Sequence, residues 1–349
     1  MPWAQTVKGI IEAGQLGVIL PHEHILCDAQ SSFFFEPLNP AEMQLAYEPV
    51  TLDNLAWIRA HALNNLDCLK MPEVDILVKE LSEYRKAGGC TIVDVSTKPL
   101  GGDNPLKLLH LADLTGLNII MGCGFYKSDL PQVSTATEKK IGMELIKDLT
   151  EGIGDSTICA GIIGEISITR KLAPLEIKLL RACAIAQSET GAPIAIHPPG
   201  LDYTLINKIL NILEESGGIA EKTIICHVDI MGLPDIENIK RLIDTGCNVE
   251  FDTFGHLFPP FVVPGGVMDF PGDGQRVRAI KQLVDMGYAS QILISHDTFL
   301  KVLLRSYGGF GYAHILQNIV PVMLSYGIQQ SDIEAMLHNN PTRLLAYLN

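Results

Sequence analysis

The stretch Gly17–His24 is an apolar run that ends in His22-Glu23-His24, a His-x-His pattern. Side chains two residues apart in a β-strand point to the same face, so His22 and His24 would direct both imidazoles at one point. Two neutral imidazoles can begin a metal site. Because such pairs also occur by chance on exposed strands, the interpretation depends on whether later strands end in similar residues.

Later apolar stretches do end in residues of this kind. Together with the first pair they form a set of four histidines and two carboxylates: His22, His24, Glu165, His197, His227 and Asp297. Singly, a strand-end His is often a hydrogen-bonded core residue, and a strand-end Asp often caps the next helix. Six together favour one site for two divalent ions of the zinc type, with one carboxylate between them. Glu23 and His296 alternate away from this point, and we expect them to pack elsewhere.

The elements that would position these residues alternate between strands and helices. Strands are predicted over 16–24, 90–95, 118–124, 159–165, 192–197, 223–227, 247–251 and 291–297, with amphipathic helices over 74–87, 104–115, 137–151, 174–190, 203–216, 234–245 and 275–287. Strands without polar alternation are typical of a parallel sheet that is covered on both faces. Eight such units predict an α/β fold, the (β/α)8 TIM barrel, whose active sites lie at the carboxyl ends of the strands.

The domain organisation follows from this rhythm. The whole chain, residues 1–349, is predicted to form a single barrel domain with the metal site at its mouth. Residues 25–72 interrupt the alternation with Phe33-Phe34-Phe35, several prolines and a helix expected over 52–66, and they read as an insertion near the barrel mouth. An open doubly wound sheet is the main alternative, but it would more often carry a glycine-rich phosphate loop after the first strand, and none is present.

Composition narrows the classes of partner. The 26 Lys and Arg against 40 Asp and Glu leave a net charge of −14 with no basic cluster, which argues against nucleic acid and anionic membranes. No apolar run is long enough for a membrane span, and no signal peptide is recognisable. The eight cysteines are scattered without a Cys-x-x-Cys, as expected of reduced thiols in the cytosol. We therefore expect a cytoplasmic enzyme with a small-molecule substrate; a homodimer is the oligomeric state considered.

The chain resembles the phosphotriesterase-related branch of the amidohydrolase superfamily over nearly its whole length. The resemblance rests on the motifs His22-Glu23-His24, Gly124-Phe125-Tyr126, Gly161-Ile162-Ile163-Gly164-Glu165-Ile166, Ser295-His296-Asp297, Tyr307-Gly308-Gly309-Phe310-Gly311-Tyr312 and Asn340-Pro341-Thr342-Arg343. It implies that His22, His24 and Asp297 bind the more buried metal, that His197 and His227 bind the more exposed one, and that Glu165 bridges them. Bacterial phosphotriesterases and lactonases use a carboxylated lysine as the bridge, so Glu165 is a departure that argues against phosphotriester hydrolysis.

The resemblance also implies a reaction and a substrate. Members of this branch are associated with splitting N-acetyltaurine, and other N-acyl taurines, into taurine and a carboxylate. A hydroxide between two Zn²⁺ ions would attack the amide carbonyl, and Asp297 would carry its proton to the leaving amine. A lactonase or phosphotriesterase with the same metals is the first rival, and a metal-bearing barrel that binds without turnover is the second.

Residues for substrate contact are expected on the loops after the strands. A sulfonate needs a cation or several N–H donors, and Lys301 is the preferred candidate ahead of Arg305, Lys98 and Lys127. Tyr126 closes the third strand and could hydrogen-bond the substrate or metal-bound water. Tyr307 and Phe254 are expected near the site as well. Each of these residues could instead be ordinary surface or packing.

Overall fold

The computed structural model describes residues 1–102, 104–233, 235–264 and 266–347. In this part of the chain eight parallel strands form one sheet in the order β12-β9-β8-β7-β6-β5-β4-β3. The strands are β3 (Ile19–Glu23), β4 (Thr91–Asp94), β5 (Asn118–Cys123), β6 (Ile162–Ser167), β7 (Ile194–His197), β8 (Thr223–Ile225), β9 (Asn248–Phe251) and β12 (Ile292–Ile294). The predicted (β/α)8 barrel is thus confirmed, and all eight predicted strands are present.

The first and last strands meet at their carboxyl ends. The backbone N–H of His22 donates to Ser295 Oγ at 3.1 Å, and Ser295 Oγ donates to the carbonyl of His22 at 2.8 Å. The N–H of Asp297 also donates to the carbonyl of His22 at 3.2 Å. These bonds bring the first and the last predicted metal ligands, His22 and Asp297, together, although they lie near opposite ends of the sequence.

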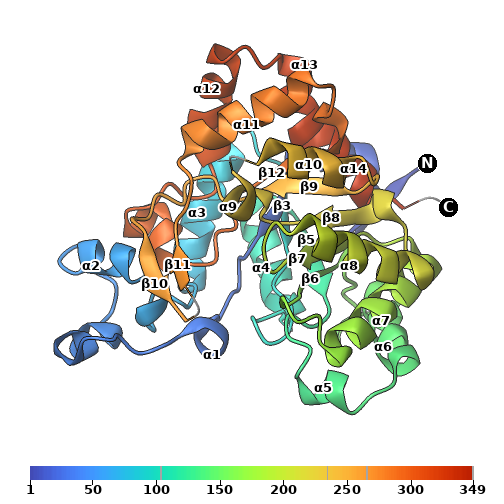
Figure 1. The fold of residues 1–349 in the computed structure, drawn as a ribbon, viewed down its shortest axis with the longest axis horizontal. Helices are drawn as coiled ribbons and strands as arrows, with labels where there is room; N and C mark the ends of the chain where they lie inside the picture. Colours follow the sequence, from blue (N-terminus) through green and yellow to red (C-terminus); the bar gives the residue numbers. More distant parts are fainter. Residues whose placement is uncertain (103, 234, 265, 348–349) are drawn as a thin grey trace.

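Helices surround the sheet, as Figure 1 shows. Those that follow the strands are α3 (Val74–Lys86), α4 (Pro105–Thr115), α6 (Glu138–Thr150), α7 (Pro174–Thr190), α8 (Tyr203–Glu215), α10 (Ile236–Ile243) and α11 (Asp273–Asp285), with the short α9 (Val228–Gly232) directly after β8. Their apolar faces bury the outer side chains of the strands. A second apolar cluster fills the barrel itself, with one side chain from most strands, such as Ile19, Val93 and Ile224. Among the described helices, none combines the length and apolar character that a membrane span requires.

The amino-terminal end of the barrel is closed by the two ends of the chain. The hairpin of β1 (Trp3–Thr6) and β2 (Gly9–Glu12) and the 3-10 helix η1 (Ala13–Leu16) pack against α14 (Asn340–Leu345). The rings of Trp3 and Tyr347 stack at 4.5 Å. The two ends of the described chain accordingly lie close together at the right of Figure 1.

Three segments differ from the sequence expectations. Within 25–72, the helix expected over 52–66 is broken into α2 (Leu55–Ala60) and η3 (Ala62–Asn64), because His61 leaves helical geometry at φ −143°. The same segment contains α1 (Gln30–Phe33) and the 3-10 helix η2 (Pro40–Ala46). After β9, an unexpected hairpin of β10 (Phe261–Val263) and β11 (Gly266–Met268) forms.

The third segment is the chain after β12, where the sequence pattern predicts no helix. It forms the short 3-10 helices η6 (Lys301–Leu303) and η7 (Arg305–Tyr307), and then a helical arm. The arm consists of η8 (Ile315–Ile319), α12 (Val320–Ser325), α13 (Gln330–Glu334), η9 (Ala335–Asn339) and α14, and completes the helical layer beside α11.

Candidate metal centre and active-site cavity

The six predicted ligands converge at the carboxyl ends of the strands. Glu165 lies centrally: its Oε1 is 2.8 Å from His197 Nδ1 and 2.6 Å from His227 Nε2. Its Oε2 is 3.9 Å from His24 Nε2. Asp297 Oδ1 lies 3.1 Å from the same His24 nitrogen. The carboxylate of Glu165 therefore stands between two groups of imidazoles, as a bridging ligand would.

His22 is the most deeply buried member of this set. Its Nε2 is buried without a hydrogen-bond partner in the described structure, and lies 3.7 Å from Glu165 Oε1 and 3.6 Å from Asp297 Oδ1. A buried ring nitrogen without a partner normally costs free energy. It is directed at carboxylate oxygens, where a cation would satisfy all of these groups, so the residues fit a metal site. Nitrogen and oxygen ligands of this type suit zinc-like divalent ions.

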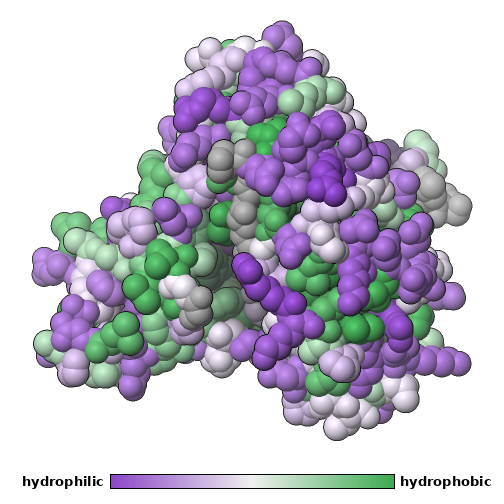
Figure 2. All heavy atoms as spheres, viewed as in Figure 1, coloured by the Kyte–Doolittle hydropathy of each residue, from purple (hydrophilic) through white to green (hydrophobic). Residues whose placement is uncertain are grey.

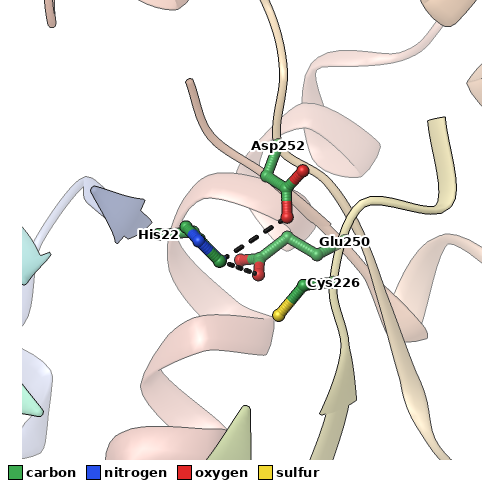
Figure 3. A group of neighbouring side chains, drawn as sticks. All are labelled: His22, Cys226, Glu250 and Asp252. Carbon is green, nitrogen blue, oxygen red and sulfur yellow. Dashed lines mark hydrogen bonds and ion pairs between the residues drawn. The ribbon is translucent and has the colours of Figure 1, made fainter. Parts of the chain in front are cut away.

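A cluster below the site holds the other edge of the His22 ring. Figure 3 shows His22 facing Glu250 and Asp252, with Cys226 beside them. His22 Nδ1 is 3.0 Å from Glu250 Oε2 and 3.5 Å from Asp252 Oδ2. An Nδ1–H that donates to a carboxylate leaves Nε2 free as a ligand and fixes the ring orientation.

Two further imidazoles, those of His24 and His227, are oriented in the same way. His24 Nδ1 lies 2.9 Å from Ser96 Oγ, and His227 Nδ1 lies 2.8 Å from Asp252 Oδ1. Asp252 also accepts the backbone N–H of His227 at 2.9 Å. Two of the predicted ligands, His227 and Asp297, adopt a left-handed backbone conformation, with φ 56° and 49°. This conformation is unfavourable for residues other than glycine. Such conformations persist because the surrounding hydrogen bonds determine them.

Glu23 and His296 form the hydrogen bonds that hold the backbone around Asp297. As predicted, both point away from the ligands, and both are buried. Glu23 Oε1 accepts from His296 Nδ1 at 2.7 Å and from the N–H of His296 at 3.0 Å. Its Oε2 accepts the N–H of Thr298 at 3.0 Å. One carboxylate therefore holds the backbone on both sides of Asp297.

The carboxylates of the site produce an electrostatic field that favours positively charged groups. Burial opposes the protonation of His22, but Glu165 and Asp252 outweigh it and raise the His22 pKa to about 10. Burial also opposes the ionisation of Glu165, yet His197 and His22 hold its pKa well below the usual range. Such a field attracts protons or divalent cations, and a cation that binds neutral imidazoles would displace the protons.

A cavity of about 320 Å³ opens above these residues. Its floor is polar and consists of five of the predicted ligands: His24, Glu165, His197, His227 and Asp297. Its wall is mainly apolar, with the side chains of Phe33, Phe35, Leu63, Met268, Phe270 and Phe299. In Figure 2 the face between the β10–β11 hairpin and the barrel is hollowed, with hydrophobic (green) residues beside the hollow. The insertion 25–72 and this hairpin thus shape the wall.

Of the four residues expected to contact the substrate, one lines the cavity and three do not. Tyr126 lines the cavity, and its OH is 3.5 Å from His197 Nδ1. Lys301 does not: it is buried, and its Nζ pairs with Asp67 at 2.5 Å. Tyr307 lies beside the ammonium group of Lys301, whose Nζ is 5.4 Å from the centre of the Tyr307 ring. Phe254 is buried against Arg276, whose guanidinium lies 5.9 Å from the ring centre.

Lys301, Tyr307 and Phe254 are therefore absent from the described cavity lining. The expected sulfonate contact by Lys301 is not formed, because that cation already has a buried partner. The missed lining residues, Phe270 and Phe299 among them, gave only a weak signal, since an aromatic residue in a loop is usually simple packing. The run Phe33-Phe34-Phe35 was the best clue, and two of its three side chains reach the cavity.

Fold and site together define the class of protein: a hydrolase barrel of the amidohydrolase type with a candidate metal centre at its mouth. The Phosphotriesterase family matches residues 2–345, and the chain belongs to this family. The family is metal-dependent.

Several known proteins are similar to this chain over almost its whole length. The chain is 38% identical to the N-acetyltaurine hydrolase of Dictyostelium discoideum, across 99% of this chain and 98% of that protein. It is 36% identical to the phosphotriesterase-related protein of Nematostella vectensis, with the same coverage of 99% and 98%. The crystal structure of a resiniferatoxin-binding protein from Rhodobacter sphaeroides superimposes with a TM-score of 0.93 at 30% identity, covering 98% of this chain and 94% of that one. The homodimer and the cytosolic location remain predictions.

Proposed function

We propose that this protein is a binuclear metal-dependent amidohydrolase that cleaves N-acetyltaurine, and other N-acyl taurines, to taurine and a carboxylate. The observation that carries the proposal is the position of Glu165, whose two carboxylate oxygens face different imidazoles of one ligand set. The substrate is supported by relatives named N-acetyltaurine hydrolase that align with almost the whole chain.

The ligands divide into two groups in this proposal. His22, His24 and Asp297 would hold one divalent cation, His197 and His227 would hold the other, and Glu165 would contribute an oxygen to each. When bound, cations of the zinc type supply Lewis acidity, which lowers the pKa of a bound water and polarises the amide carbonyl. The side chains of Glu250, Ser96 and Asp252 keep the ligating nitrogens directed at the site.

Asp297 is the proposed catalytic residue. Its carboxylate lines the cavity and is fixed from behind by Glu23, so it can take a proton from the attacking water without moving. It would then give this proton to the nitrogen of the breaking amide, because an amine leaves readily only after protonation. Tyr126 OH, which lies on the same side as His197, is placed to hydrogen-bond the substrate.

Acetate release from N-acetyltaurine by zinc-loaded protein tests the proposal. N-acetylated amino acids, a lactone and a phosphotriester run alongside separate the amidase from its rivals. Release of taurine and acetate in equal amounts, lost on chelation and restored by zinc, is the expected result. Hydrolysis of only the lactone or the phosphotriester would replace the substrate but retain the centre, whereas metal binding without any hydrolysis would favour the non-catalytic barrel.

A further inference from the structure

The wall of the cavity is chemically unlike the taurine end of the proposed substrate. Phe33 and Phe35 come from the insertion, Met268 and Phe270 from the hairpin region, and Phe299 from the segment after β12. All five side chains are only partly covered by protein. An apolar ligand group that covered them would remove this surface from water, which is favourable for binding.

The aromatic part of the wall stands directly over the floor. The ring centre of Phe33 is 5.7 Å from that of Tyr126 and 5.9 Å from that of Phe299. Phe299 in turn lies 6.4 Å from the ring of His24, which is a predicted ligand. A substrate carbonyl at the floor would therefore place its first substituent carbons against Phe33 and Phe299.

Cations are missing from the same surface. No Lys or Arg side chain lines the cavity in the described ranges 1–102, 104–233, 235–264 and 266–347. Two of the candidates from the sequence are already paired, Lys301 with Asp67 and Lys98 with Glu144 at 3.5 Å. An unpaired sulfonate buried against phenylalanine would be strongly unfavourable. The anionic end must then remain in water at the mouth.

We propose that the wall is an acyl-binding site, and that the preferred substrates are amides whose acyl group is apolar and several carbons longer than acetyl. This inference rests on the proposed function and specifies its substrate class: the acyl chain lies against the wall, and the taurine group points out of the mouth. N-acetyltaurine is accepted because it meets the floor, but it leaves the wall uncovered.

A chain-length series on the unmodified zinc-loaded protein is the direct test. The substrates are N-acetyl-, N-butyryl-, N-hexanoyl- and N-octanoyltaurine, and the readout is kcat/KM from taurine release. Because each buried methylene favours binding by about threefold, kcat/KM should rise at least about tenfold from acetyl to hexanoyl. A flat or falling series with acetyl hydrolysed would overturn the acyl site and leave the proposed function intact. No taurine release at any length would overturn both.

Two neighbouring phenylalanines provide a matched pair of variants. Phe33→Ala removes a ring from the wall and should lower kcat/KM for N-hexanoyltaurine by about tenfold, and for N-acetyltaurine much less. Phe34→Ala is the control, because Phe34 is not a lining residue and its ring faces Tyr47 at 6.1 Å. Equal losses for both substrates in Phe33→Ala, or the same selective loss in Phe34→Ala, would contradict the proposal.

Discussion

The floor of the cavity consists of polar side chains at strand ends, whereas its wall consists of apolar side chains on loops, short helices and a hairpin. The floor is held by hydrogen bonds and ion pairs that join strands far apart in sequence, such as His22 with Glu250 at 3.0 Å. The phenylalanines and the methionine of the wall are apolar and partly exposed. The floor is therefore suited to hold a fixed geometry, and the wall to set which group is accepted.

The difference predicts two separable kinds of defect. A change in the floor, or in the residues that orient it, should alter metal binding or kcat. A change in the wall should alter the preference among substrates while the metal remains bound. The following experiments test that separation, beginning with the largest expected effect.

Asp297→Asn should lower kcat at least about a hundredfold, because the amide nitrogen then lacks its proton donor. Most of the metal should remain, since the asparagine oxygen is still a possible ligand and five other ligands are unchanged. Measuring kcat beside metal content separates the two effects. Asp285→Asn is a suitable control, because that residue is exposed on α11, pairs with Lys281 and does not line the cavity. A near wild-type rate in Asp297→Asn would refute its role as the proton carrier.

Glu250→Gln should weaken metal binding about tenfold or more, because the amide is a poorer acceptor for the Nδ1–H of His22. Competition with a chelator measures this affinity without reference to turnover. Glu83→Gln, a change on α3 at a half-buried residue that pairs with Lys86 and does not line the cavity, should leave the midpoint of the chelator titration unaltered. An unaltered midpoint in Glu250→Gln as well would show that the buried cluster in Figure 3 does not support the floor.

Tyr126→Phe tests the boundary between floor and wall, since this residue has a ring in the wall and an OH 3.5 Å from His197. Loss of the OH should lower kcat/KM by about threefold to tenfold, the value of one hydrogen bond, without a change in metal content. Loss of metal in Tyr126→Phe would show that the OH group supports the metal site through His197 rather than binding the substrate.

Lys301→Met should have the smallest effect on the reaction. Because the ammonium group pairs with Asp67 away from the cavity, KM for N-acetyltaurine should stay within about twofold. The melting temperature should fall by a few degrees, since removal of one partner leaves the other charge unpaired. A tenfold rise in KM at an unchanged melting temperature would restore Lys301 as the sulfonate contact.

The barrel and the convergence of the six candidate ligands could be predicted from the sequence. Strand ends are recognisable as an apolar run followed by a polar residue, and the barrel brings every such end to one rim. His22 and Asp297 therefore needed no knowledge of tertiary contacts to be placed together. The alternation of side chains along a strand also predicted that Glu23 and His296 turn away, although not that they would hold the backbone of Asp297.

The tertiary structure alone decided the wall, the partners of the buried charges and the packing of the loops. Leu63 and Phe270 lie far apart in the sequence, and no local pattern indicates that both line one cavity. The same holds for Lys301, whose pairing with the sequence-distant Asp67 makes an expected substrate contact a structural one. Local periodicity determines strands and the direction of their side chains, whereas loop packing depends on contacts distant in sequence, which periodicity does not encode.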